Sequence, residues 1–280
     1  MREIKQEQII EAVKSLCMEA NYELPQDVQK AIFDAYQNED GELAKETLGI
    51  LRKNADIART STMPICQDTG MACVFVEMGQ DVHVQGSLQE AINEGVRQGY
   101  QQGYLRKSIV DDPVFDRKNT MDNTPAFIRY EIVAGDQLKI TVAPKGFGSE
   151  NMSQLKMLKP SDGVEGIKEF VLKVVNDAGP NACPPMVIGV GIGGSFDYVT
   201  WLAKKAMLRE IGTHHPDQRY QALEVELLDK INQLGIGPAG YGGKTTALSL
   251  NIETAPTHIA GMPVAVSICC HVARHKEVIL

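Results

Sequence analysis

The chain has 280 residues and a net charge of −8, and it is 43% hydrophobic and 23% charged. This composition is typical of a soluble globular protein, and the acidic balance argues against nucleic acid as a partner. The sequence has no apolar run of about 18 residues, so it predicts no membrane span. The charged start, Met1–Gln8, has no apolar signal core, and we expect a cytoplasmic protein.

Residues 1–60 are predicted to form a mainly helical lead segment. Apolar residues recur at helical spacing in three stretches, from Ile9 to Ala20, from Val28 to Ala35 and from Leu43 to Ala55. Cys17 lies in the first apolar stripe. Because an unmodified cysteine packs like a small hydrophobic residue, we expect Cys17 in the core.

A short polar segment follows, Pro64-Ile65-Cys66-Gln67-Asp68-Thr69-Gly70. Its proline and glycine predict a tight turn that presents a thiol, an amide, a carboxylate and a hydroxyl group in a row. Taken alone, the segment is more simply interpreted as an ordinary turn that contains a half-buried cysteine.

The pattern then changes to that of strands and a helix. Ala72–Met78 is predicted to be a strand, with Asp81–Gln85 returning beside it. Ser87 is a candidate cap for a helix from Leu88 to about Tyr104. A polar, irregular stretch from Arg106 to Thr124 follows. Loops of this length are often functional, although a solvated surface loop is the simpler interpretation.

The second half continues the alternation of strands and helices. Phe127–Val133 and Leu138–Ala143 are predicted to form a hairpin. Glycines and a lysine in Pro144–Asn151 suit an anionic ligand, or a plain flexible loop. The sequence contains no repeat or linker, so we expect one domain over residues 1–280. Its predicted class is α+β, with the helical lead segment followed by mixed β-sheets surrounded by helices. The further predicted elements are a helix around Ile167–Val175, a strand at Met186–Val190, helices at Ser195–Glu210 and Gln218–Leu234, and strands at Ala247–Ile252 and Val264–Ile268.

Two glycine patterns are unconvincing as nucleotide sites. Gly189, Gly191 and Gly194 satisfy G-x-G-x-x-G between a strand and a helix, but the second strand of a βαβ unit does not follow. Gly243-Lys244-Thr245 resembles the end of a phosphate-binding loop, but Pro238 stands where that loop needs a glycine. We therefore predict nucleotide binding at neither pattern.

Six cysteines in a chain without an export signal indicate thiols or metal ligands more than disulfides. Cys66, Cys183 and Cys270 lie in predicted loops, and the prolines after Cys183 predict an extended backbone there. Adjacent strand residues face opposite ways, so only one of Cys269 and Cys270 should reach a shared centre. Three thiolates from distant loops could bind zinc or an iron–sulfur cluster, and spacing does not choose between them.

Several segments together resemble one known family, the alpha-type iron–sulfur hydro-lyases that act on tartrate and fumarate. Pro64–Gly70 is similar to the P-x-C-Q-D-T-G motif of that family. The greatest likeness is to the alpha subunit of two-subunit class I fumarate hydratase, and alpha subunits of L-tartrate dehydratase look similar. The other segments that carry the resemblance are Asp122–Ala126, Lys145–Asn151, Cys183–Pro185, Gly191–Gly194, Thr257–Val266 and Cys270–Arg274.

The resemblance implies a [4Fe-4S] cluster held by Cys66, Cys183 and Cys270, with one iron left open. An open iron can act as a Lewis acid on a hydroxyl or carboxylate group of the substrate. Ser267-Ile268-Cys269 departs from the Asn-x-Gln that is usual in the family, while the residues that follow Cys270 favour Cys270 as the ligand.

The resemblance also implies substrate contacts from Gln67, Asp68, Arg106 and a backbone amide near Gly148, and a proton-transferring pair of Asp68 and His258. The implied activity is the reversible hydration of fumarate to L-malate, with L-tartrate dehydration as the alternative. The implied partner is a beta subunit that completes the active site, in a dimer of alpha–beta units. Two other classes stay open, a non-catalytic iron–sulfur module for binding or redox sensing and a zinc protein.

Overall fold

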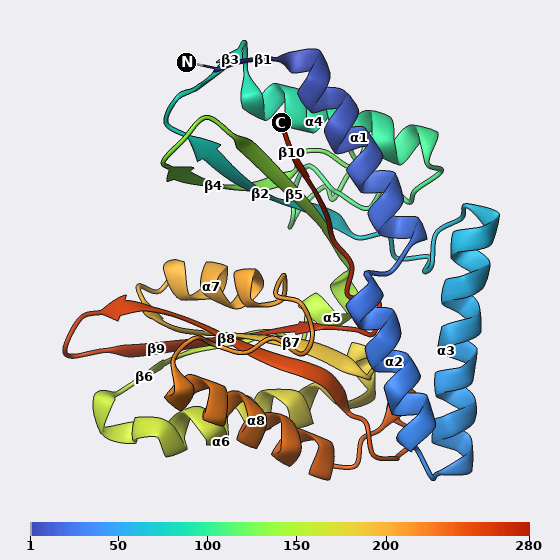
Figure 1. Ribbon diagram of the computed structural model, residues 1–280, viewed down its shortest axis with the longest axis vertical. Helices are drawn as coiled ribbons and strands as arrows, with labels where there is room; N and C mark the ends of the chain where they lie inside the picture. The colour runs from blue at the N-terminus through green and yellow to red at the C-terminus, as the bar shows by residue number, and fades with distance from the viewer. Residues whose placement is uncertain (1) are drawn as a thin grey trace. The chain divides into compact units, whose positions relative to one another are not determined.

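The chain folds into two units, each built around its own four-stranded β-sheet (Figure 1). In this computed structural model, which describes residues 2–280, the first unit comprises the chain up to Pro25, Asn54–Phe147 and Arg274–Leu280. The second comprises Gln26–Lys53 and Gly148–Ala273. Mixed sheets flanked by helices confirm the predicted α+β class. That both units form one domain stays a prediction. None of the helices in residues 2–280 has the length and apolar composition needed to cross a membrane.

The sheet of the first unit has the strand order β10-β5-β2-β4. Its central strand, β2, pairs in parallel with β4 and antiparallel with β5, and β10 is antiparallel to β5. Helix α3 (Glu42–Ser61) has its first residues in the second unit and continues in the first unit from Asn54. The other elements of the first unit are β1 (Arg2–Lys5), α1 (Gln6–Tyr22), β2 (Met71–Gly79), β3 (Val82–Gln85), α4 (Leu88–Gln102), β4 (Phe127–Val133), β5 (Leu138–Lys145) and β10 (Lys276–Ile279).

The predicted apolar faces form the core of the first unit. Ile9, Val13 and Cys17 of α1 are buried against residues of α4, β2 and β5, such as Ile92 and Val74. Burying a large aliphatic side chain contributes about 1.5–3 kcal/mol, so this cluster holds the helices on the sheet. The hydroxyl of Ser87 accepts a hydrogen bond from the N–H of Glu90 at 3.2 Å, which confirms the predicted cap of α4.

Two predicted strand pairings are wrong. Strand β3 does not return beside β2; it pairs in parallel with β1 in a separate two-stranded sheet. Strands β4 and β5 do not form a hairpin either, because β2 lies between them. The first six residues of β2 are almost all buried, whereas the side chains of β4 are half-buried or exposed. A strand covered on both faces gains most from the central position, and its long-range pairing replaces the local hairpin.

The sheet of the second unit has the order β6-β9-β7-β8, with α7 on one face and α6 and α8 on the other (Figure 1). Apolar residues of α6, α8 and the sheet form the larger core, and α7 packs on the opposite face through Val199 and Ala203. The predicted helix at Ser195–Glu210 is shorter than expected. The elements are α2 (Gln26–Asn38), α5 (Phe147–Glu150, whose first residue belongs to the first unit), β6 (Gln154–Leu158), α6 (Gly163–Ala178), β7 (Met186–Gly194), α7 (Tyr198–Ala206), α8 (Gln218–Gln233), β8 (Ala247–Thr257), β9 (Met262–Cys269), and the 3₁₀ helices η1 (Pro160–Asp162), η2 (Gly179–Ala182) and η3 (Pro238–Gly240).

The glycines of β7 explain the G-x-G-x-x-G pattern without a nucleotide. A Cβ atom on Gly189 would lie 2.0 Å from the carbonyl oxygen of Ala203, and one on Gly191 would lie 2.2 Å from that of Val199. Both carbonyls belong to α7, so the glycines let this helix pack directly on the strand.

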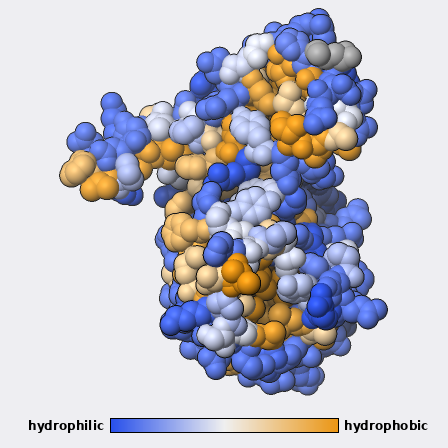
Figure 2. Space-filling model, turned by 90° about the vertical axis from the view of Figure 1, so that its left-hand side faces the viewer, coloured by the Kyte–Doolittle hydropathy of each residue, from blue (hydrophilic) through white to orange (hydrophobic). Residues whose placement is uncertain are grey.

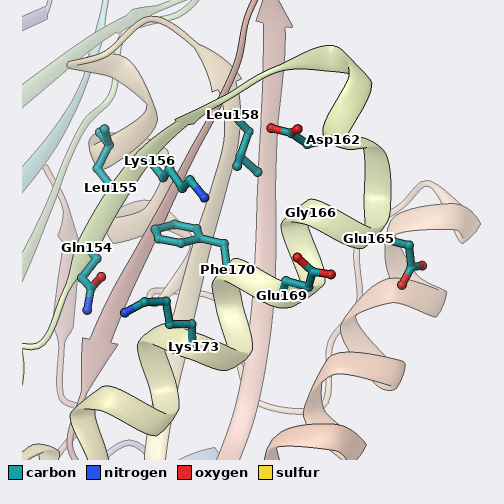
Figure 3. Close-up of a pocket in the computed structure, with 10 residues that line it drawn as sticks. All are labelled: Gln154, Leu155, Lys156, Leu158, Asp162, Glu165, Gly166, Glu169, Phe170 and Lys173. Carbon is teal, nitrogen blue, oxygen red and sulfur yellow. The ribbon is translucent and has the colours of Figure 1, made fainter.

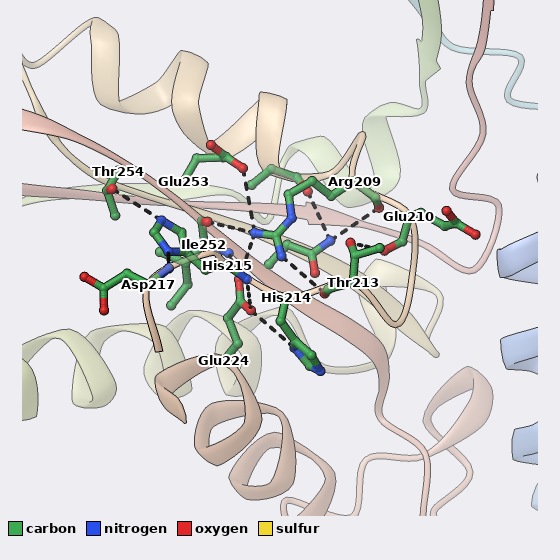
Figure 4. A network of polar contacts seen from close by, with 12 residues as sticks. Arg209, Glu210, Thr213, His214, His215, Asp217, Glu224, Ile252, Glu253 and Thr254 are labelled. Atoms are coloured by element: carbon green, nitrogen blue, oxygen red, sulfur yellow. Dashed lines mark hydrogen bonds and ion pairs between the residues drawn. The ribbon is translucent and has the colours of Figure 1, made fainter. Parts of the chain in front are cut away.

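A buried carboxylate on α8 ties three segments of the second unit together (Figure 4). Glu224, only 1% exposed, accepts hydrogen bonds from the Arg209 guanidinium at 2.9 Å, the Ile252 N–H at 2.8 Å and the His215 N–H at 3.0 Å. Arg209 also donates to the Ile252 carbonyl at 3.0 Å. The network therefore fastens the chain that follows α7 to both α8 and β8.

Replacement of Glu224 by alanine should lower the free energy of unfolding of the second unit by about 3 kcal/mol, because it removes the buried acceptor shared by Arg209, Ile252 and His215. Of its carboxylate contacts, Arg209 would keep only the looser one with Glu253, at 3.7 Å. Urea unfolding followed by the fluorescence of Trp201, the one tryptophan in the sequence, measures this unit specifically. Glu226→Ala is the control, since Glu226 lies on the same helix as Glu224 but is only half-buried, and it forms ion pairs with Lys168 of α6 and Lys230 of α8. Equal midpoints for both variants would show that the buried pair does not stabilise the unit.

Candidate functional site

The turn that carries Cys66 is anchored at Ile65, the residue before the cysteine. The Ile65 N–H donates to the carbonyl oxygen of Asn21 at 3.0 Å, and the Asn54 amide donates to the Ile65 carbonyl at 2.8 Å. The Ile65 side chain is buried. With both backbone groups paired and the side chain packed, the approach to Cys66 is held in one conformation.

Cys66 is half-buried, and its sulfur lies at the inside of the turn. The Asp68 N–H donates to the Cys66 Sγ at 3.4 Å, and the thiol contacts the Gln67 Oε1 at 3.3 Å. This contact holds the sulfur against the backbone of the turn. Gln67 is exposed beside it.

The Asp68 carboxylate is fixed by two backbone N–H groups. Its Oδ1 accepts from Gly70 at 3.0 Å, and its Oδ2 accepts from Phe147 at 2.9 Å. Gly70 has a φ of 72°, and a Cβ there would lie 2.6 Å from the backbone of Lys145, so only glycine fits this close contact. The Arg274 guanidinium donates to the Asp68 carbonyl at 2.6 Å. The Gly70 and Phe147 N–H groups thus orient the carboxylate, and the Arg274 guanidinium holds the backbone of the same residue.

Arg106 joins the same turn through its backbone. Its N–H donates to the Thr69 hydroxyl at 2.9 Å, and that hydroxyl donates to the Arg106 carbonyl at 3.2 Å. The buried Tyr100 hydroxyl donates to the carbonyls of Thr69 and Gly70, at 2.8 and 2.9 Å. The Arg106 side chain itself is exposed. Gln67, Asp68 and Arg106 therefore lie within one hydrogen-bonded assembly of the first unit.

Two buried cations beside Asp68 were not among the predicted site residues. Lys145 is 4% exposed and donates to the Gly146 carbonyl at 3.2 Å, while Arg274 is 6% exposed. Within residues 2–280, the Nε and Nη1 of Arg274 have no hydrogen-bond partner. A buried guanidinium with unpaired donors suits an anionic ligand. The sequence already suggested that the lysine of Pro144–Asn151 suits an anionic ligand, whereas Arg274 appeared only as one member of a longer motif.

In the second unit, Cys183 follows η2 and is exposed. The predicted extended backbone is wrong, because Cys183 has φ 52° and ψ 62° and is left-handed. Its N–H donates to the Pro180 carbonyl at 3.0 Å. The last hydrogen bond of the 3₁₀ turn thus determines the conformation at Cys183, rather than the prolines that follow it.

Cys270 comes directly after β9 and next to Cys183 in space. The backbone N–H of His271 donates to the Cys183 carbonyl at 3.3 Å, and the His271 Nδ1 lies 3.0 Å from the same oxygen. Cys269, the last residue of β9, is buried, whereas Cys270 is half-buried. Of the two neighbouring thiols, that of Cys270 is therefore the more accessible.

His258 and Gly148 lie elsewhere in the second unit. His258 is exposed in the turn after β8, where its Nδ1 accepts from the Ala260 N–H at 3.2 Å. Gly148 is exposed in α5, and a Cβ there would meet only the Asn181 carbonyl oxygen, at 3.9 Å. Open space around Gly148 leaves room for a ligand to approach the backbone.

The predicted site residues therefore form separate groups in the two units. Cys66, Gln67, Asp68 and Arg106 are brought together in the first unit, and Cys183 lies beside the segment of Cys270 in the second. Over the described residues, neither unit by itself contains three His, Cys, Asp or Glu side chains grouped to hold a metal ion.

A separate cavity of about 630 Å³ lies between β6 and α6 of the second unit (Figure 3). Charged side chains of both signs surround the apolar ring of Phe170 there. None of the predicted site residues lines it. Its lining consists of Gln154, Leu155, Lys156, Leu158, Asp162, Glu165, Gly166, Glu169, Phe170 and Lys173.

Known proteins resemble this chain across both units. A profile of the family described as fumarate hydratase (Fumerase) matches residues 10–279. A protein of Methanocaldococcus jannaschii, provisionally named L(+)-tartrate dehydratase subunit alpha, is 43% identical over 271 residues, which cover 95% of each chain. A protein of Escherichia coli O157:H7, named L(+)-tartrate dehydratase subunit alpha, is 34% identical over 265 residues, which cover 92% of this chain and 86% of the relative.

The environments of the cysteines predict which thiols can be alkylated in the native chain without bound metal. Burial raises the pKa of the Cys17 thiol from 9.0 to about 12, which lowers its thiolate fraction at pH 8 by about 1,000-fold. Iodoacetamide should therefore label Cys66, Cys183 and Cys270 well before Cys17, as measured by peptide mass spectrometry. In urea, Cys17 should react like the others. Native labelling of Cys17 as fast as that of Cys183 would contradict the burial.

Proposed function

Because this chain belongs to the iron–sulfur hydro-lyase family of fumarate hydratase and tartrate dehydratase alpha subunits, we propose that it is the alpha subunit of a [4Fe-4S]-dependent hydro-lyase. The proposed reaction is the reversible hydration of fumarate to L-malate. The family match over residues 10–279 is the observation that carries it. L(+)-tartrate dehydration is the second candidate, favoured by the names of the relatives.

The residues present are suited to an iron–sulfur cluster. Cys66 receives a backbone N–H at its sulfur, and Cys183 and the segment of Cys270 are linked by the His271 hydrogen bond. Thiolates are the protein ligands of such clusters, and a buried cation such as Arg274 suits an anionic group. In the proposal, Cys66, Cys183 and Cys270 hold the cluster. When bound with one iron open, it supplies a Lewis acid for a substrate oxygen.

The side chains of the first unit orient the substrate in this proposal. Gln67 and Arg106 are exposed next to the fixed carboxylate of Asp68. The forked guanidinium of Arg106 suits a substrate carboxylate, and the Gln67 amide can donate to a second oxygen. A backbone N–H near Gly148, where the surface is open, is the further proposed contact. A dicarboxylate held at both ends presents its central carbons to the catalytic groups.

Asp68 and His258 are the proposed proton-transfer pair. Hydration adds a proton to one carbon and a hydroxyl group to the other, so groups that give and take protons are required. Backbone N–H groups hold the Asp68 carboxylate in place, and the imidazole of His258 offers one nitrogen that donates and one that accepts. The His258 Nδ1 already accepts the Ala260 N–H, which leaves Nε2 as the nitrogen that carries the mobile proton.

The relatives are named as alpha subunits, and this supports a beta subunit as the partner. We propose that the beta subunit completes the substrate site and that alpha–beta units form a dimer in the cytoplasm. A dianionic substrate and a chain of net charge −8 repel each other at long range. Further cations from the partner would offset this repulsion.

Replacing each proposed ligand should remove the cluster. Cys66→Ser, Cys183→Ser and Cys270→Ser proteins, purified anaerobically with the partner, should lose most iron and acid-labile sulfide, because a hydroxyl replaces a thiolate. Cys269→Ser is the matched control, since Cys269 is the adjacent cysteine and is buried. Full iron and sulfide in Cys270→Ser, with loss in Cys269→Ser, would reassign the third ligand to Cys269.

The complete enzyme should hydrate fumarate. Asp68→Asn and His258→Asn should each reduce turnover by at least about 100-fold while retaining the cluster, because each removes a positioned acid or base. Anaerobic assays on fumarate, L-tartrate and methylfumarate, with iron content measured in parallel, provide the test. The alpha chain by itself should be inactive. Turnover of L-tartrate in place of fumarate would select the second candidate, and no turnover of any substrate by the cluster-loaded complex would contradict the enzyme.

A further inference from the structure

Strand β4 forms one edge of the sheet in the first unit (Figure 1). It pairs with β2 along its whole length, from Phe127 opposite Cys73 to Val133 opposite Gly79. On its other side no strand of residues 2–280 pairs with it. The backbone N–H and C=O groups of alternate residues in β4 therefore face outward, and such a row can pair with another strand.

Although β4 carries Arg129 and Glu131, its length and its exposed apolar side chains leave this edge poorly protected. Protected edge strands are usually short or carry charges and prolines. The opposite edge, β10, fits that description, with four residues that include Lys276 and Glu277. In contrast, β4 is seven residues long and exposes Phe127, Tyr130 and Ile132 by 50%, 46% and 65%. Figure 2 shows that hydrophobic side chains do reach the surface among polar ones. A strand of this kind indicates a protein interface.

The side chains of β4 alternate between two faces, as in any strand. Ile128, Tyr130 and Ile132 share one face, and Ile128 packs partly against the core of the unit. Arg129 and Glu131 share the other face with the two end residues. An occupant of this edge should therefore offer apolar groups on the core side and a complementary charge pattern on the other.

The sequence of β4 is complementary to itself when two copies run antiparallel. We propose that two copies of this chain pair through their β4 edges about a two-fold axis at Tyr130, so that two four-stranded sheets become one continuous sheet. Every cross-strand pair is then apolar with apolar or acid with base. The opposed residues are Phe127 and Val133, Ile128 and Ile132, Arg129 and Glu131, and Tyr130 with its own copy.

The charges select this register over its neighbours. With the axis at Tyr130, each Arg129 faces Glu131 of the other copy, and the two-fold axis produces this pair twice. An axis at Arg129 would place two arginines opposite each other, and an axis at Glu131 would do the same with two glutamates. Like charges directly opposite in a sheet are destabilising, whereas opposite charges stabilise. This self-complementarity identifies a second copy as the occupant, and it does not depend on the proposed enzymatic function.

Charge reversal tests the pairing through the molar mass in solution. The unaltered full-length chain should sediment as a dimer, and Arg129→Glu or Glu131→Arg should raise the dimer dissociation constant by at least about tenfold, because both symmetric pairs become repulsive. Mixing the two single variants should restore dimers, and so should the double variant Arg129→Glu/Glu131→Arg. Lys156→Glu, on the β6 edge of the second unit, is the matched control and should leave the dimer unchanged.

Disulfide trapping tests the register itself. Tyr130→Cys places two new thiols opposite each other at the axis, within bridging distance, and should give a covalent dimer under mild oxidation. Ile132→Cys is the control in the same background. Its two thiols would lie four residues apart along the strands, at about 14 Å, which is too far for a disulfide.

Three results would overturn the proposal. One is a monomer at all accessible concentrations, both for the chain and for its complex with the partner subunit. Another is a dimer that survives Arg129→Glu and Glu131→Arg unchanged. The third is loss of partner-subunit binding, rather than of self-association, in these variants, because the edge would then belong to the partner. Restoration of dimers on mixing the single variants excludes simple misfolding as the cause of dissociation.

Discussion

The first unit depends on the immobilisation of one turn, the segment from Ile65 to Gly70. Backbone polar groups in a buried turn must find partners, and here the partners come from elements far apart in sequence. Helices α1, α3 and α4 supply the Asn21 carbonyl, the Asn54 amide and the Tyr100 hydroxyl. The turn therefore keeps its conformation only when these helices pack correctly. Folding of the unit and presentation of the Cys66 thiol are thus one event.

The loop from Arg106 to Thr124 is held to the same turn, which explains how an irregular segment can position a side chain. The Asn123 side chain accepts the Ser108 N–H at 2.7 Å and donates to the Gly70 carbonyl at 3.2 Å. Asn123 is fully buried and left-handed, a conformation that asparagine tolerates better than most residues. The start and the end of the loop are thereby joined to each other and to the Cys66 turn.

Local sequence patterns predicted much of the secondary structure, but they did not predict which strands pair when the partners are far apart in sequence. The apolar stripe of α1 and the Ser87 cap involve neighbours along the chain, so periodicity and capping rules detect them. Strand β2 lies between β4 and β5, and β3 pairs with β1. No pattern within a single strand predicts these partners. The left-handed Cys183 shows the same limit, because the hydrogen bond to Pro180 outweighed the preference set by the next residue.

For the candidate site, composition and spacing suggested thiol chemistry, and only the longer motifs suggested a protein family. Three loop cysteines were compatible with zinc or an iron–sulfur cluster, while the glycines of β7 looked like a nucleotide motif. The structure gives those glycines a packing role against α7. It also separates buried Cys269 from half-buried Cys270, which alternation along a strand anticipated.

The first unit buries cations although the whole chain has a net charge of −8. Burying the Arg274 guanidinium costs desolvation energy that its hydrogen bond to the Asp68 carbonyl does not repay. Such residues persist where an anion stabilises them. The unpaired Nε and Nη1 of Arg274, in the described chain, are donors that neither the Asp68 carbonyl nor other protein groups use. An anionic ligand beside the Cys66 turn would satisfy them, so its binding should stabilise the first unit as well as fill the site.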